Sequence, residues 1–288
     1  MPIHPAPPED LAGMVEGYQR TVRSVIDLGR SCGPADFAAP TSCPGWSMQD
    51  HFAHVAAVEA YLDGAEHPDV ELVERCHLRH ELGEWMEAGV QLRRERPGSE
   101  VVDELELLLH NRLASLANPE LTLESEVRAP MERTLPLGTL LRLRLNDIWV
   151  HEQDLREALG RPGDLDTVAA ATVVASIVSS FPGLVAKLHL PEGEAVILDC
   201  TGPVTARVGV RMSHGEDGRP WAHPLFSGDT ETPTDGAVPD GPSTTIILST
   251  DALTRRAAGR RSTQDTAYRV VGDEDLAARV LDALVITP

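Results

Sequence analysis

Residues 138–159 constrain the fold of this chain more than any other stretch, because they predict one long helix with ionisable side chains inside its apolar face. No Pro or second Gly interrupts the stretch after its first residue, and the segment GRPG at 160–163 ends it. At about 100° per residue, leucines and an isoleucine form an apolar arc. Since buried charges are costly unless they are paired or bound to a metal, polar residues within this arc indicate a site. The polar line within the arc consists of Arg144, Asp147, His151 and Asp154.

Asp147 and His151 are spaced like two ligands of one metal ion. They are four residues apart, so one helical turn places both side chains on the same face. Paired histidines on a helix hold zinc with the same geometry. Composition alone predicts about two acid–histidine pairs of this spacing, and what distinguishes this pair is its place within the apolar arc. The other three pairs are Asp50/His54, Asp63/His67 and Glu106/His110.

A second helix is predicted to begin at Ser47, which is an N-cap residue with Asp50 as the acid of a capping box. His54 falls on the buried face of this helix. Together with Asp147 and His151 it gives three protein ligands and an open position, the pattern of catalytic zinc. Asp154 is then expected to support His151 or to accept a proton from substrate. Two alternatives stay open: His51 takes the place of His54, or His54 is a core histidine beside an internal Asp147–His151 ion pair.

The pattern of helical and strand segments in the sequence predicts an α+β protein with two domains. Residues 1–162 are expected to form an antiparallel four-helix bundle, and residues 163–288 a small α+β domain. In the first domain we expect helices at 11–30, from Ser47, at 70–96, at 100–117 and at 138–159, with an irregular stretch at 119–137. In the second we expect a helix at 165–188, strands at 195–200, 205–212, 243–250 and 268–273, a long loop at 213–242, and helices from 251 and from 274.

Composition excludes several classes of partner. A net charge of -20 argues against binding to nucleic acid or to an anionic membrane. The N-terminus is polar, so no signal peptide is expected, and the apolar stretch 168–190 carries serines and a lysine, which favours a core helix. No paired spacing relates the four cysteines, which predicts a cytoplasmic protein with free thiols. These cysteines are Cys32, Cys43, Cys76 and Cys200.

Two further groups of residues are candidates for chemistry. Arg255, Arg256, Arg260 and Arg261 lie within seven residues and are suited to hold a carboxylate, although a solvated helix face explains them equally well. Cys43 lies near a helix N-terminus, where a thiolate is activated, but the following Pro and Gly also fit a turn. The sequence contains no GxGxxG, P-loop or GxSxG motif.

Motifs in both halves resemble one known family. CPGWSMQDHFAHVAAVE (43–59) and NDIWVHEQDLREALGRP (146–162) are similar to two signatures of the mycothiol-dependent maleylpyruvate isomerase family, a branch of the DinB-like bundle proteins. STTIILSTDALTRRAAGR (243–260) and YRVVGDEDLAARVL (268–281) resemble the C-terminal domain of that family, which is similar to sterol carrier folds. The resemblance covers nearly the whole chain.

The resemblance implies a divalent metal, usually zinc, on His54, Asp147 and His151. The family usually has Glu where this chain has Asp147, which is shorter by one methylene. The resemblance also implies that the protein uses mycothiol, a small actinobacterial thiol. The thiolate of mycothiol would add to an electrophilic substrate in isomerisation or S-transfer. Arg255, Arg256 and Arg260 would anchor a carboxylated substrate.

Two alternatives keep the fold. One is a non-catalytic protein that binds a small molecule, and the other is a tailoring enzyme of secondary metabolism that works without thiol. The electrophile, the metal and the oligomeric state stay open.

Overall fold

The computed structural model describes residues 3–72, 78, 80–215, 218–226 and 241–286. The chain divides into two compact units, Pro8–Asp164 and Leu165–Pro288 with Met1–Pro7. We call them the helical unit and the sheet unit. The mixture of helices and sheet confirms the predicted α+β class, while the likenesses to DinB-like bundles and sterol carriers remain predictions.

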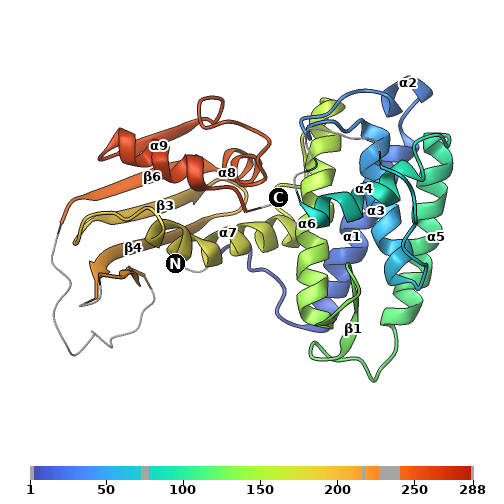
Figure 1. Ribbon diagram of the computed structural model, residues 1–288, viewed down its shortest axis with the longest axis horizontal. Coiled ribbons are helices and arrows are strands. Elements are labelled where there is room, and N and C mark those ends of the chain that lie inside the picture. Colours follow the sequence, from blue (N-terminus) through green and yellow to red (C-terminus); the bar gives the residue numbers. More distant parts are fainter. Residues whose placement is uncertain (1–2, 73–77, 79, 216–217, 227–240, 287–288) are drawn as a thin grey trace. The chain divides into compact units, whose positions relative to one another are not determined.

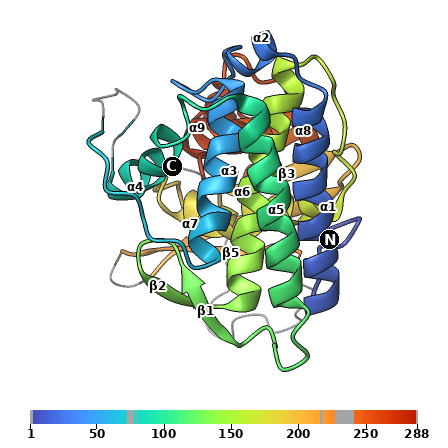
Figure 2. The ribbon, with the colours of Figure 1, turned by 90° about the vertical axis from the view of Figure 1, so that its right-hand side faces the viewer.

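Four long helices build the core of the helical unit. α1 contacts α5 and α6, and α3 contacts the same two helices, so each packs against two neighbours (Figure 2). Their inward side chains are apolar and buried, Met14, Phe52 and Leu141 among them. The four helices are α1 (Leu11–Arg30), α3 (Met48–Leu62), α5 (Gly98–Leu116) and α6 (Leu137–Ala158), and two shorter ones are α2 (Pro34–Phe37) and α4 (Glu81–Gln91).

The helix that carries His54 begins where its capping residues predict. The Ser47 side chain accepts a hydrogen bond from the Asp50 backbone N–H, and the Asp50 carboxylate accepts one from the Ser47 backbone N–H at 2.9 Å. This reciprocal pair satisfies two amide donors that the first turn leaves without helical partners. The start of α3 is therefore fixed at Ser47.

Two expectations for the helical unit are wrong. Of the described residues in the helix predicted at 70–96, only those of α4 are helical, and residues 65–72 are not. Cys76 and His77 lie outside the described residues. The stretch 119–137 contains a hairpin of β1 (Glu126–Ala129) and β2 (Arg133–Pro136). Its turn holds Met131 and Glu132 at φ 61° and 55°, where Gly or Asn is usual, so the sequence lacked the ordinary hairpin signal.

The described residues of the sheet unit form a five-stranded sheet with helices packed on it. Strands β3 and β6 are parallel, and the other neighbours are antiparallel. Val196 and Leu198 of β3 are buried in alternation, as expected for a sheet with one covered face. The strand order is β5-β4-β3-β6-β7, with β3 (Ala195–Thr201), β4 (Ala206–His214), β5 (Pro220–Pro224), β6 (Ser243–Ser249) and β7 (Tyr268–Val271).

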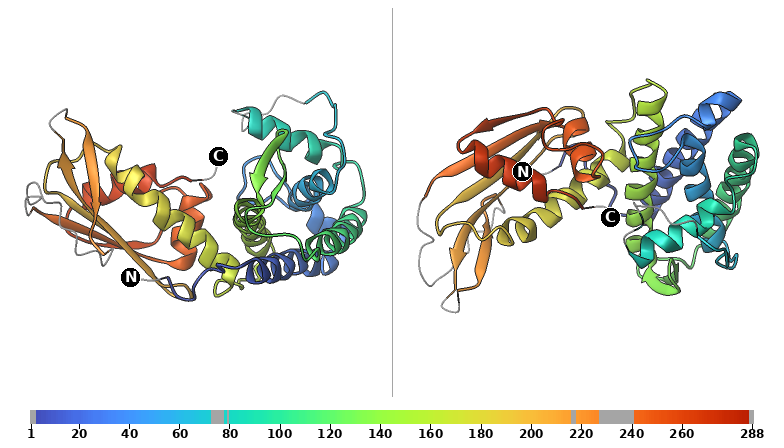
Figure 3. Two further views of the ribbon diagram at one scale, coloured as in Figure 1. Left: turned by 90° about the horizontal axis from the view of Figure 1, so that it is seen from below. Right: turned by 45° about the horizontal axis from the view of Figure 1, so that its top comes forward.

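The helices of the sheet unit contact the strands and one another (Figures 1 and 3). α7 (Val168–Ala186) packs on β4 and β5, while α8 (Thr250–Ala257) and α9 (Glu274–Ala283) pack on β6. α7 is long and apolar enough to cross a membrane, but half of its most apolar window is buried within the protein. The prediction of one long loop at 213–242 is wrong in one respect, because β5 lies within this stretch. Residues 227–240 are outside the described part.

Replacing Gly29 by Ala is expected to destabilise the helical unit. A Cβ at this buried position of α1 would lie 2.5 Å from Val102 Cγ2 and 3.0 Å from the Phe52 ring. Overpacking costs about 1–3 kcal/mol, which outweighs the gain of about 1 kcal/mol from Ala in a helix. Denaturant unfolding of Gly29→Ala should therefore show a net loss. In a Val102→Ala background the same change should cost less by about 1 kcal/mol, and equal costs in both backgrounds would contradict the predicted contact.

Glu104 is expected to make stability depend on acid pH. Burial raises the pKa of this carboxyl, but hydrogen bonds and charges from Arg93 and Arg96 outweigh burial and lower it below its ordinary value. Because the folded-state pKa is lowered, the stabilisation is present above the unfolded-state pKa and is lost as the pH falls through the folded-state value. Glu104→Gln should flatten the acid limb of the free energy of unfolding against pH. Glu100→Gln, at an exposed position of the same helix, is the control and should leave that limb unchanged.

Candidate metal centre

The predicted ligands come from two helices that pack together. α3 supplies His51 and His54, three residues apart, and α6 supplies Asp147, His151 and Asp154 at intervals of four and three residues. Both spacings keep their side chains on one helix face. The contact between α3 and α6 turns the two faces toward each other.

His54, Asp147 and His151 converge on one point. His54 Nε2 lies 3.1 Å from Asp147 Oδ2 and 3.3 Å from Oδ1, and His151 Nε2 lies 3.4 Å from Asp147 Oδ1. The two imidazoles are buried, whereas the Asp147 side chain is 32% exposed. The three side chains therefore bring two nitrogens and a carboxylate together at a place that solvent can reach.

A buried hydrogen-bond network holds one oxygen of the Asp147 carboxylate. The Arg144 guanidinium donates to Asp147 Oδ2 and also to Glu59 Oε1, the latter at 2.8 Å. Glu59 Oε2 in turn accepts a hydrogen bond from the Tyr18 hydroxyl at 2.7 Å. Tyr18, Glu59 and Arg144 are all at most 4% exposed. Arg144 is thus held by two acids, and the Asp147 oxygen nearer His151 stays available to the imidazoles.

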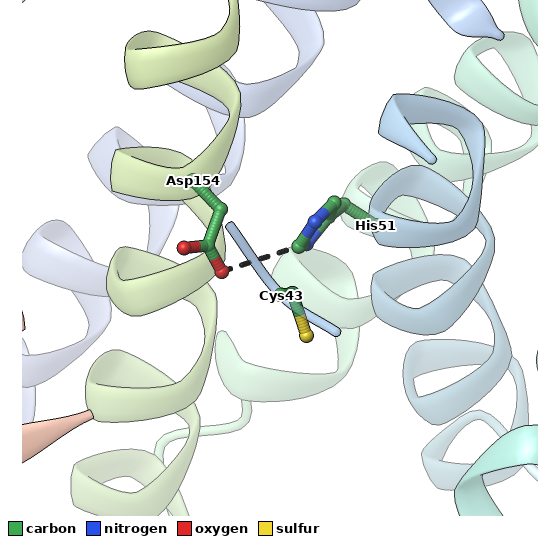
Figure 4. A group of neighbouring side chains, drawn as sticks. All are labelled: Cys43, His51 and Asp154. Carbon is green, nitrogen blue, oxygen red and sulfur yellow. Dashed lines mark ion pairs between the residues drawn. The ribbon is translucent and has the colours of Figure 1, made fainter. Parts of the chain in front are cut away.

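His51 and Asp154 lie behind His151. Asp154 Oδ2 is 3.4 Å from His151 Nδ1 and 3.8 Å from His51 Nδ1, and the two Nδ1 atoms are 2.9 Å apart. The side chains of His51 and Asp154 point toward each other (Figure 4) and are fully buried. If His151 binds a metal through Nε2, its Nδ1–H must donate to one of these two neighbours. They are therefore placed to fix the tautomer and the orientation of His151.

Trp46 covers the histidines. Its ring centroid lies 5.4 Å from that of His51, 5.2 Å from that of His54 and 5.4 Å from that of His151. The indole N–H donates to Glu87 Oε2 of α4 at 3.0 Å, which holds the ring in place. The tryptophan thereby limits the access of water to the imidazoles on its side.

The charges at the centre suit metal binding. Burial raises the pKa of Asp147, but the charges of His54 and Arg144 outweigh it and hold that pKa well below its usual range. Burial lowers the pKa of His54. For His151, burial lowers the pKa, but hydrogen bonds with Asp147 and Asp154 outweigh burial and raise it. The site thus offers a carboxylate and one neutral imidazole near neutral pH, and a metal would compete with a proton for His151.

The predicted arginines lie in the sheet unit, on and after α8. The Arg256 guanidinium donates to the backbone carbonyls of Leu281 at 2.8 Å, Arg261 at 2.9 Å and Asp282 at 3.0 Å. Arg255 is 2% exposed, and Arg260 Nη1 donates to the Ala258 carbonyl at 2.9 Å. Arg256 therefore fastens α9 to α8, and the substrate role of all three arginines stays a prediction.

Sequence reasoning did not assign Tyr18, Glu59, Thr41 or Trp46 to the site. Glu59 carried a usable signal, because an isolated acid within an apolar helical stretch has to find a buried partner. Trp46 belongs to the CPGW motif. Tyr18 lies among core residues of α1, and Thr41 lies in a loop. Thr41 and Trp46 contact the histidines directly, whereas Tyr18 and Glu59 are linked to Asp147 through Arg144. Only the packing of α1, α3 and α6 shows that second link.

Comparisons with known proteins identify the domain that carries the candidate metal centre. Residues 18–156, within the helical unit, match the model of the mycothiol maleylpyruvate isomerase N-terminal domain. No curated protein matches the chain.

Two solved structures share the fold. They are crystal structures of the mycothiol-dependent maleylpyruvate isomerase and of a variant with one histidine replaced by alanine. Each is 18% identical to this chain, with 90% of this chain and 92% of the other covered. The TM-scores are 0.51 for the isomerase and 0.54 for its variant.

Glu59→Gln is expected to destabilise the helical unit strongly. The change removes one of the two acids that neutralise the buried Arg144, and loss of a buried charge partner costs about 3 kcal/mol or more. Urea unfolding of the metal-free protein measures the loss. Glu16→Gln, at an exposed position of α1, should change the free energy of unfolding by no more than about 0.5 kcal/mol. Equal effects of the two substitutions would show that Glu59 does not carry this charge.

Proposed function

We propose that this chain is a metal-dependent enzyme that uses mycothiol to act on an electrophilic small molecule. The observation that carries the proposal is the convergence of His54, Asp147 and His151, in a domain of the mycothiol maleylpyruvate isomerase family. His54, Asp147 and His151 would hold the metal, and zinc suits two imidazoles and a carboxylate.

The distances support these ligands. Donor atoms at zinc–ligand lengths around one tetrahedral ion lie about 3.3–3.4 Å from one another. Asp147 Oδ1 lies 3.3 Å from His54 Nε2 and 3.4 Å from His151 Nε2. Asp147 meets both imidazoles although it is one methylene shorter than the Glu usual in the family. Three protein ligands leave a fourth position for another molecule.

A bound divalent ion would supply a nucleophile by lowering the pKa of a coordinated thiol, so that thiolate forms near neutral pH. The chain's own residues prepare the ligands. Arg144 holds Asp147 in its anionic form and fixes one of its oxygens. Asp154 or His51 would accept a hydrogen bond from His151 Nδ1–H, so the proton stays on Nδ1 and Nε2 keeps the lone pair that a ligand needs. Trp46 keeps water from one side of the imidazoles.

The thiol chemistry gives two outcomes. Addition of the mycothiol sulfur to an electrophilic carbon forms a C–S bond, and elimination after rotation breaks it and returns the thiol with a cis–trans isomer. An adduct that keeps the C–S bond is the product of S-transfer. We favour isomerisation of a carboxylated substrate in the cytoplasm, because the solved structures with this fold are maleylpyruvate isomerases. Arg255, Arg256 and Arg260 are the proposed carboxylate anchors.

His151→Ala tests the ligand set. The variant should lose the metal held with His54 and Asp147, and mycothiol-dependent isomerisation of maleylpyruvate should fall about 100-fold or more. His110→Ala is the matched control, since Glu106/His110 has the same spacing but His110 is exposed on α5. Metal content by elemental analysis and turnover by absorbance are measured on both proteins after circular dichroism shows that each is folded.

A His151→Ala protein with full metal content and activity would rule out the proposed ligands. Wild-type protein that takes up no metal, and that binds apolar ligands without turnover, would favour the non-catalytic binding protein instead. Turnover of a substrate without mycothiol would favour the thiol-independent alternative.

A further inference from the structure

A groove on the helical unit is lined by arginines and shares no residue with the candidate metal centre. It has a volume of about 440 Å³ and lies between α1 and the segment that follows α6. The groove is lined by four arginines and two aspartates, whereas the whole chain has 45 acidic and only 25 basic residues. A local excess of positive charge in so acidic a protein suits an anionic ligand. The charged residues of the groove are Arg20, Arg23, Asp27, Arg156, Arg161 and Asp164.

The segment after α6 is held in place as one wall of the groove. Gly160, at φ 63°, follows the last turn of α6, and the Arg161 backbone N–H donates to the Arg156 carbonyl at 2.9 Å. Further along, the Trp149 indole N–H donates to the Asp164 carbonyl at 3.0 Å. Asp164 itself has φ 55°, which is uncommon for a residue other than glycine. The segment is therefore folded back against α6, and its charged side chains line the groove.

Two of the four arginines are paired with acids of the helical unit. Arg156 Nε donates to Glu152 Oε1 at 2.7 Å, and the same guanidinium donates through Nη2 to Asp164. Arg23 Nη1 donates to Glu106 Oε1 of α5 at 2.9 Å. Because these two guanidiniums already have carboxylate partners at hydrogen-bond distance, we do not expect them to anchor a ligand.

The other two arginines keep N–H donors that a ligand could use. The Arg20 guanidinium lies 3.8 Å from Asp164 Oδ1, beyond hydrogen-bond distance, and its side chain is 64% exposed. Arg161 Nη1 donates to the Ser31 hydroxyl at 2.7 Å. Among the described residues, no carboxylate lies within ion-pair distance of the Arg161 guanidinium. Since a guanidinium has five N–H donors, both side chains are able to bind carboxylate or phosphate oxygens.

These two arginines mark opposite ends of the groove. Arg161 is bonded to Ser31, and Arg20 precedes Ser31 by three turns of α1, which corresponds to about 16 Å along the helix. One compact ion is too small to meet both guanidiniums. Between the two ends the groove is lined by the apolar side chain of Leu28 and by the carboxylate of Asp27, which would repel a negative group. The ends are therefore suited to negative charge and the middle is not.

We propose that this groove binds an elongated small molecule with an acidic group at each end and an uncharged middle. Arg20 would hold one acidic group and Arg161 the other, because the planar guanidinium matches carboxylate and phosphate oxygens. A volume of about 440 Å³ is in the ordinary range for ligand pockets. The groove is separate from Arg255, Arg256 and Arg260, which belong to the sheet unit. Its ligand does not depend on the function proposed for the metal centre.

Calorimetric titration of the full-length protein with suberate, a straight-chain dicarboxylate, tests the groove at low ionic strength, where charges are weakly screened. Arg20→Ala and Arg161→Ala should each weaken suberate binding about tenfold or more, as expected for the loss of charge-assisted hydrogen bonds. Arg142→Ala is the matched control, because Arg142 is an exposed arginine of α6 outside the groove, and this variant should bind suberate like the wild type.

Three further probes test the two-ended geometry. Octanoate has the same chain with a single carboxylate and should bind about tenfold more weakly than suberate. The bisphosphate of hexane-1,6-diol shows whether phosphate is preferred to carboxylate as the end group. Failure of both two-ended probes to bind would overturn the proposal, and so would equal binding of octanoate and suberate. Inorganic pyrophosphate that binds more tightly than either two-ended probe would show a site for one compact anion instead.

His54→Ala separates this proposal from the proposed function. The substitution removes a ligand of the metal centre only, so the folded variant should bind suberate like the wild type. Suberate binding that is lost in His54→Ala but unchanged in Arg20→Ala and Arg161→Ala would place the diacid at the metal centre and overturn the groove. Loss of binding in the two arginine variants, with metal content unchanged, would support the groove whatever the metal centre does.

Discussion

The buried guanidinium of Arg144 is the constraint on which the helical unit depends. A positive charge that is 4% exposed is tolerated only when acids surround it. Glu59 from α3 and Asp147 from the next turn of α6 provide them, and Tyr18 of α1 hydrogen-bonds to Glu59. This one charge thereby links three helices and determines how α3 and α6 face each other.

The same pairing prepares the candidate metal centre. Asp147 stays ionised because Arg144 is beside it, and an ionised carboxylate is what both neighbouring imidazoles and a metal require. Since replacement of Arg144 would leave the buried Glu59 and the partly exposed Asp147 without their common partner, stability and metal affinity should change together. The site and the core of the helical unit are therefore one polar network rather than two independent features.

Helical spacing explains why two pairs of histidine and acid lie side by side. His51 and His54 are one turn apart on α3, and Asp147 and Asp154 are two turns apart on α6. Each histidine of α3 therefore approaches a different acid of α6, with His151 between them. The loop before α3 brings Cys43 near His51 and Asp154, and Trp46 of the same loop covers the imidazoles.

The sequence by itself determined the helix over α6, the start of α3 at Ser47 and the family of the domain at 18–156, because periodicity, capping and motif spacing are local properties. It also placed His54, Asp147 and His151 as one predicted ligand set. The sequence did not predict the hairpin after α5, because the turn of this hairpin lacks Gly and Asn. The helix predicted at 70–96 is longer than α4, because charged residues at helical spacing do not by themselves form a helix. Only the tertiary structure decided that Glu59, hydrogen-bonded by Tyr18, neutralises Arg144 and that Cys43 lies near Asp154. These contacts join segments far apart in the chain and depend on how the helices pack.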